Sequence, residues 1–154
     1  MLTMEQAVAL LQDRDDNQAY QALLFLEEQT LISNAVYVYF DDFLQLLQNE
    51  HTYVKMRAIR LVAKNARWDI EHKLENNIES YISLLQDSKP AVVREVIRNM
   101  KEIVPYKPQL LPILEEAFLT IPLQNYKESM ASLIVRDQED FEKWIEKRTK
   151  EDLI

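Results

Sequence analysis

Two histidines are the residues of this chain whose type most readily suggests metal binding. His72 lies three residues before Glu75, one turn away on a helix, and His51 lies in a segment with no acidic cluster of its own. A metal site needs three or four ligands that converge from several elements, and one His-x-x-Glu pair supplies two at most. We therefore expect no metal site, and a solvated helix face around His72.

Paired carboxylates could in principle serve as a general acid and a general base. The side chains of adjacent residues on a helix point about 100° apart, so neighbouring carboxylates do not face one another as a dyad. No combination of serine, histidine and acid can be argued from the sequence either. We therefore expect no catalytic residues and a protein that is not an enzyme. The carboxylate pairs are Glu27-Glu28, Asp41-Asp42 and Glu115-Glu116.

The residue types that the chain lacks exclude further chemistry. It contains no cysteine, so it can form neither a disulfide framework nor a thiolate nucleophile. It also contains no glycine, which removes the Walker loop and the GxGxxG dinucleotide fingerprint. We expect no cofactor.

Positive charge is concentrated in the middle of an acidic chain of net charge −8. Residues 1–50 hold one basic and nine acidic residues, whereas residues 51–108 hold eleven basic and seven acidic residues. Four cations follow one face of a predicted helix, and we expect this basic stripe to be solvated and to bind another protein or an acidic peptide segment. Alternatively, it is a solubilising face or an intramolecular partner for the acidic first fifty residues. The basic stripe consists of Arg57, Arg60, Lys64 and Arg67.

Apolar residues recur at helical spacing along the chain, and we find no convincing alternation of a strand. The segment AVYVYF is rich in β-prone residues, but helical spacing continues it. Thr3 to Gln6 form a capping box before an apolar run. Prolines at 90, 108 and 122 fit first helical turns. The predicted N-caps of the later helices are Asp15 or Asp16, Ser33, Thr52, Asp69 and Asp137.

A leucine-rich tetrapeptide occurs three times, as LLQD at Leu10–Asp13, LLQN at Leu46–Asn49 and LLQD at Leu84–Asp87. The copies start 36 and 38 residues apart. Each copy is predicted to close a first helix and to precede a polar turn and a second helix. Two helices per repeat of this length are typical of a solenoid, and we expect Leu47 and Leu85 to be buried between stacked pairs.

The register of the second helices gives a slightly different offset. Aligning Val54-Lys55 with Val93-Arg94 gives an offset of 39, against 38 at the tetrapeptide. This difference predicts that the turn in the third pair is one residue longer than the turn in the second.

The run Leu84–Asp87, followed by Val93-Arg94, resembles the leucine pair, turn aspartate and Val-Arg of HEAT and armadillo repeats. The resemblance implies an all-α, right-handed α-solenoid of about four HEAT-like helical hairpins plus a C-terminal capping helix. It also implies that Arg94 pairs with a turn carboxylate such as Asp87. We expect a single domain over residues 1–154, with pairs at 3–29, 34–66, 70–104 and 108–135 and a cap at 137–150.

The expected function is that of a non-catalytic protein–protein interaction module or scaffold that uses a preformed helical surface. The alternative is a nucleic-acid-binding or DNA-repair protein similar to the HEAT-like alkylpurine glycosylases, which would use the central arginines with Trp68 and Asp69. The net negative charge argues against affinity for phosphates. No apolar run approaches the ~20 residues that span a bilayer, and we expect a cytoplasmic protein that binds no membrane. The sequence identifies neither the partner nor the oligomeric state.

Overall fold

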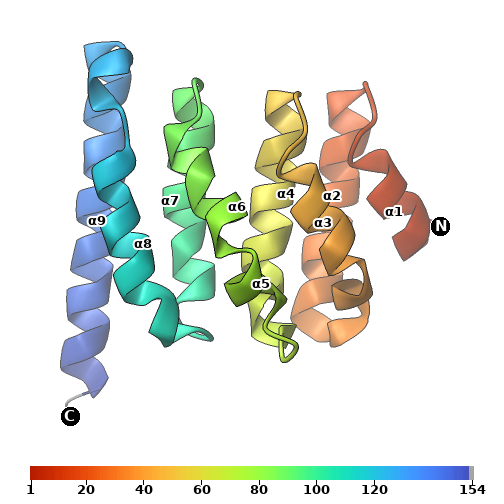
Figure 1. The fold of residues 1–154 in the computed structure, drawn as a ribbon. Helices are drawn as coiled ribbons and strands as arrows, with labels where there is room; N and C mark the ends of the chain where they lie inside the picture. Colours follow the sequence, from red (N-terminus) through yellow and green to blue (C-terminus); the bar gives the residue numbers. More distant parts are fainter. Residues whose placement is uncertain (153–154) are drawn as a thin grey trace. The chain divides into compact units, whose positions relative to one another are not determined.

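Helices and turns make up the described part of the chain, and no strand occurs in it. The computed structural model describes residues 1–152. The prediction of an all-α protein is therefore confirmed for these residues. The α-helices are α1 (Met4–Leu10), α2 (Asp16–Ile32), α3 (Phe40–Leu46), α4 (Thr52–Asn65), α5 (Lys73–Asn76), α6 (Ile78–Ile82), α7 (Pro90–Ile103), α8 (Leu111–Ala117) and α9 (Glu128–Asp152) (Figure 1).

Short 3-10 turns extend or connect these helices. They are η1 (Asn34–Tyr39), η2 (Ala66–Trp68), η3 (Ser83–Gln86), η4 (Pro108–Leu110), η5 (Phe118–Thr120) and η6 (Leu123–Asn125). The β-prone segment AVYVYF lies in η1 and the start of α3, so its helical prediction is confirmed in the tighter 3-10 form. Branched side chains disfavour the α-helix only slightly, and burial of Val36 and Phe40 outweighs that preference.

The chain folds as two compact units, of which the first is Met1–Tyr81 and the second begins at Ile82. In the first unit, α1 packs on α2, α3 packs on α4, and α2 packs on α4. Figure 1 shows α1 and α3 in front of α2 and α4. The single domain and the pair boundaries predicted from the sequence stay predictions. The fully buried residues at the centre of the first unit include Leu11, Leu23, Leu26, Phe40, Phe43, Leu47, Ile59 and Leu61.

In the second unit, α7 packs against both η3 and the long helix α9. Phe141 of α9 is fully buried, and its ring lies edge-on to Phe118 with ring centroids 5.7 Å apart. The ring of Trp144 is tilted by 33° to that of Phe141, with ring centroids 6.0 Å apart. The predicted N-cap at Asp137 is wrong, because α9 runs without a break from Glu128 through this residue.

The junction between the first and second helix is built in the same way at all three tetrapeptides. The N–H of the turn residue donates to the main-chain oxygen of the first leucine, at 3.0 Å for Asp13 and Asn49 and 3.1 Å for Asp87. The side-chain Oδ1 of the same residue then accepts from the N–H two residues later, at 2.8, 2.9 and 2.9 Å respectively. The three donors are the N-caps of the second helices, Asp15, His51 and Lys89.

This shared Asx turn sets the length of each junction, so the prediction of a longer turn in the third pair is wrong. The N-cap is the second residue after the acceptor in every copy, because the side-chain bond closes only over that distance. The sequence alignment paired Val54 with Val93, whereas the equal junctions pair it with Val92. Both valines are buried, so the apolar pattern alone does not distinguish them. The second leucine is fully buried in every copy, which confirms the predicted burial of Leu47 and Leu85.

Some predicted caps are confirmed and others are displaced. Thr3 and Gln6 form the reciprocal capping box, and the hydroxyl of Ser33 accepts from the N–H of Ala35. Thr52 is the first residue of α4 and not its cap, because the Asx turn places His51 at that position. The helix predicted to follow Asp69 is divided into α5, α6 and η3.

Candidate functional site

The basic stripe predicted from the sequence lies on α4, and its first member is buried. Arg57 is 6% exposed. Its Nη1 donates to the main-chain oxygen of Leu11 at 2.9 Å, and its Nη2 pairs with Asp16 at 3.0 Å. A guanidinium with donors in two directions is suited to such a bridge. Arg57 therefore holds the end of α1 and the start of α2 against α4.

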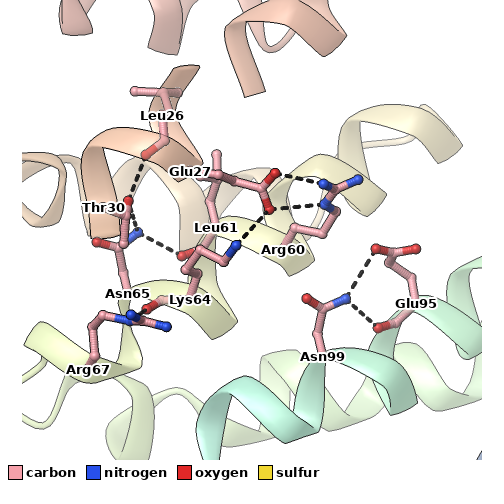
Figure 2. Close-up of polar contacts among 10 residues, drawn as sticks. All are labelled: Leu26, Glu27, Thr30, Arg60, Leu61, Lys64, Asn65, Arg67, Glu95 and Asn99. Carbon is pink, nitrogen blue, oxygen red and sulfur yellow. Dashed lines mark hydrogen bonds and ion pairs between the residues drawn. The ribbon is translucent and has the colours of Figure 1, made fainter. Parts of the chain in front are cut away.

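The next two members of the stripe converge on one carboxylate of α2 (Figure 2). Arg60 binds Glu27 through two hydrogen bonds, of 3.1 Å from Nε and 2.6 Å from Nη2. Lys64 pairs with the same carboxylate at 3.6 Å. Glu27 is only 8% exposed, so two cations compensate for the burial of its charge.

The last member of the stripe, Arg67, turns back onto its own helix. Its Nε donates to the main-chain oxygen of Lys64 at 3.0 Å, which satisfies a carbonyl near the end of α4 (Figure 2). The expectation that the basic stripe is solvated is therefore wrong. The physical reason is that α2 places Asp16 and Glu27 opposite α4, as in the alternative of an intramolecular acidic partner.

Trp68 and Asp69, the residues named for the DNA-repair alternative, form structural bonds between elements. The indole N–H of Trp68 donates to the main-chain oxygen of Thr30 at 2.8 Å. The Asp69 carboxylate accepts from the main-chain N–H groups of Lys73 and Leu74, at 3.0 and 2.8 Å. It also accepts a short hydrogen bond from the hydroxyl of Tyr37. The predicted N-cap is therefore displaced: His72 is the N-cap residue of α5, although the Asp69 carboxylate bonds the first two N–H groups of this helix.

The surroundings of Tyr37 change the pKa of its hydroxyl. Burial raises the pKa of its hydroxyl well above the ordinary value, and the adjacent Asp69 carboxylate acts in the same direction. The hydroxyl therefore stays protonated and keeps donating to Asp69. Lys73, which pairs with Asp41 at 2.9 Å, lies over the Tyr37 ring at 5.8 Å.

The histidines form no metal site within the residues that the structure describes, nor does any group of histidine and carboxylate ligands there. His72 has a left-handed backbone conformation, with φ 58°, and its Nδ1 lies 2.7 Å from Glu75 on the exposed surface. Arg94 does not form the implied pair with Asp87. Its Nε instead donates to Asp137 of α9 at 2.7 Å. The Asp137 carboxylate is buried, and Arg94 compensates for the burial of its charge.

A groove of about 610 Å³ lies between α1 and α3 in the first unit. Val8, Ala9 and Leu46 form its apolar part, and Tyr39 lines it as well. Two carboxylates, Glu5 and Asp42, line it too. Amide side chains complete the lining, namely Gln12, Gln45, Gln48 and Asn49.

The carboxylates and the three glutamine amides of this groove are exposed and have no partner within the part of the chain that the structure describes, whereas Asn49 is half-buried and its Oδ1 accepts from the N–H of His51. This distinguishes Asp42 from its neighbour Asp41, which Lys73 neutralises. Sequence reasoning missed the groove, although a signal was present. Gln12 and Gln48 occupy the third position of the repeated tetrapeptide, just after its buried leucine, and therefore project outward from equivalent places.

Comparison with known proteins finds no family model, no curated protein and no solved structure that matches this chain. Among the described residues, no helix combines the length and the apolar character needed to cross a membrane.

Proposed function

We propose that the protein is a non-catalytic protein–protein interaction module built as a HEAT-like, right-handed α-solenoid of helical hairpins. The observation that carries the proposal is the junction that occurs three times, with the same Asx turn and the same buried leucine. Helical hairpins that bury their apolar faces on neighbouring copies are the units of solenoids. Such folds offer extended preformed surfaces, which suits binding better than bond-making chemistry.

The roles of the reactive side chains support a binding function. Asp69 accepts three hydrogen bonds that join Tyr37 to the start of α5, and Glu27 is compensated by Arg60 and Lys64. Side chains held in this way maintain the fold and are poorly placed to exchange protons with a substrate.

The basic stripe is a second candidate surface for a partner. An acidic segment that bound Arg60 and Lys64 would have to displace Glu27, which belongs to the same chain and needs no association to bind. Arg57 is buried and takes no part in such a contact. An acidic partner at the stripe is therefore the weaker form of the proposal.

The nucleic-acid alternative gains no support from the surroundings of Trp68 and Asp69, whose polar atoms bind other elements of the same unit. The net charge of −8 also opposes binding to phosphates. For location we propose the cytoplasm, a reducing compartment that suits a chain without cysteine.

Affinity capture tests the proposed function. The tagged full-length chain is used to retrieve proteins from the source cells, and each candidate is purified and mixed with the chain for light scattering after size exclusion. A complex of fixed stoichiometry with one protein is the expected result. A labelled DNA duplex at low salt serves as the competing ligand. Tight binding of the duplex, with no purified protein forming a complex, would overturn the proposal.

A further inference from the structure

We propose that the groove between α1 and α3 binds an extended segment of a partner protein that carries lysine or arginine side chains. The inference rests on the proposed protein-binding function and adds to it the surface and the charge of the ligand. Three properties of the groove carry it: carboxylates without counter-ions, glutamine amides without partners and apolar side chains in the lining.

The carboxylates select the sign of the ligand. Glu5 and Asp42 are exposed and form no ion pair within the described chain, and no lysine, arginine or histidine lines the groove. The surrounding residues 1–50 hold nine acidic residues and one basic residue, so the local field attracts cations. A basic segment would approach quickly and find two carboxylates ready to pair.

The glutamine amides favour a ligand with an extended backbone. The side chains of Gln12, Gln45 and Gln48 each offer two donors and an acceptor. An extended peptide has unpaired N–H and C=O groups that match such amides, whereas the backbone groups of a helix are already bonded to one another. The amides would therefore add affinity for an extended segment and little for a helical one.

The apolar part of the lining accommodates the aliphatic parts of the ligand. Val8, Ala9 and Leu46 provide apolar surface, and Tyr39 adds an aromatic side chain beside them. The methylene stems of lysine and arginine pack on apolar surface while their charged ends reach polar groups. The volume of about 610 Å³ is within the range of ~300–1,000 Å³ that is usual for binding sites.

The same reasoning explains why this groove is preferred over the basic stripe. The cations of α4 are already bound to Asp16 and Glu27, so an acidic ligand would gain only the difference between two similar contacts. The groove presents charges and amides whose hydrogen bonds are not made within the described chain. A ligand there gains contacts without breaking any in the protein.

Nuclear magnetic resonance of the ¹⁵N-labelled full chain locates the site. The probe is a short blocked peptide in which alanine and arginine alternate, and the matched probe alternates alanine and glutamate. We expect the arginine peptide to shift the side-chain amide signals of Gln12, Gln45 and Gln48 together with the main-chain signals of α1 and α3. Shifts from the glutamate peptide at the groove, or shifts from the arginine peptide spread evenly over all acidic residues, would contradict the proposal.

Paired substitutions separate the groove from general charge. The double variant E5K/D42K should weaken binding of the arginine peptide about tenfold, whereas E28K/E79K, with the same change in net charge on exposed residues outside the groove, should weaken it less than about twofold. The variant Q45A/Q48A keeps the charge and should weaken binding about threefold to tenfold. Circular dichroism establishes that each variant is folded.

The outcomes distinguish this inference from the proposed function. Equal weakening by the two charge-reversed pairs would overturn the groove as a specific site. If a partner obtained by affinity capture bound E5K/D42K as strongly as the unmodified chain, the groove would be excluded while the protein-binding function would stand. If neither a protein partner nor the arginine peptide bound, both proposals would fail.

Discussion

Arg57 donates from Nη1 to the main-chain oxygen of Leu11 at 2.9 Å, across a sequence separation of 46 residues. Leu11 is the buried leucine at the end of α1, and Asp16, which binds the same guanidinium at 3.0 Å, begins α2. One side chain of α4 therefore fixes both ends of the first junction. Arg57, which was expected to bind a partner, instead holds elements of the first unit together.

Replacing Arg57 should destabilise the protein. The variant Arg57→Met keeps the aliphatic stem but leaves the oxygen of Leu11, on a fully buried residue, without its donor. We expect the free energy of unfolding to fall by about 1–3 kcal/mol, measured by urea denaturation. Arg98→Met is the matched control, because Arg98 is exposed and lies 3.9 Å from Asp137. Equal losses for the two variants would contradict the bridging role.

The leucines of the tetrapeptide should be among the most sensitive positions. Leu47 and Leu85 are 0% exposed. Truncation to alanine should lower the free energy of unfolding by about 2–5 kcal/mol in each case, because it removes buried methyl groups and leaves a cavity. Leu119→Ala, at a leucine that is 86% exposed, should have an effect below about 0.5 kcal/mol. Thermal and urea denaturation of the three variants measure this difference.

A double-mutant cycle should detect the ion pair between Arg60 and Glu27. Arg60→Met removes two charge-assisted bonds to a carboxylate that is 8% exposed, and should cost about 1.5–3 kcal/mol of unfolding free energy. Glu27→Gln should be destabilising as well. The double variant should cost about 1 kcal/mol less than the sum of the single variants, because the two residues share one interaction. Strictly additive losses would mean that the pair contributes nothing.

Stability should depend on pH through Glu142 of α9. Burial raises the pKa of its carboxyl to about 7, and hydrogen bonding to Glu115 and the charges of Glu115 and Glu146 act in the same direction. A group with a raised folded pKa contributes stability that is complete below its unfolded pKa and is lost as the pH rises through the folded value. The melting temperature should therefore fall between pH ~5 and pH ~8.

The variant Glu142→Gln stays neutral, so it should flatten this fall in a series of melting curves. Glu139→Gln, at an exposed position of the same helix, should leave the fall unchanged. If the Glu142 and Glu139 variants had identical pH profiles, the assignment of this pH dependence to Glu142 would be wrong.

The helical class of the chain and the places of the junctions could be predicted from the sequence because their signals are local, whereas the Asx turn that gives the junctions equal length was missed. The tetrapeptide places a leucine, an amide and a turn carboxamide or carboxylate within four residues, and the Asx turn forms between residues two apart. The capping box of Thr3 and Gln6 is equally local. Such short-range patterns depend little on the rest of the fold.

The fate of the charged residues could not be predicted, because it depends on what a distant helix places opposite them. Spacing puts Arg57 and Arg60 near one face of α4, but only packing shows that Asp16 and Glu27 of α2 meet them. The position of Asp137 also depends on a distant residue. Its side chain has the chemistry of an N-cap, yet Arg94, 43 residues away, binds it inside α9.

The Asx turns at the three junctions also bear on the unfolded chain. They close tight corners with an aspartate or asparagine side chain, and His72 is the residue in the described range whose φ is positive. Glycine, which many other tight turns use, is absent, and glycine samples more backbone conformations than any other residue. An unfolded chain without glycine has less conformational entropy to lose, by about 0.4–1 kcal/mol for each position that would otherwise be glycine. The turn chemistry of this protein therefore favours folding partly by restricting the denatured ensemble.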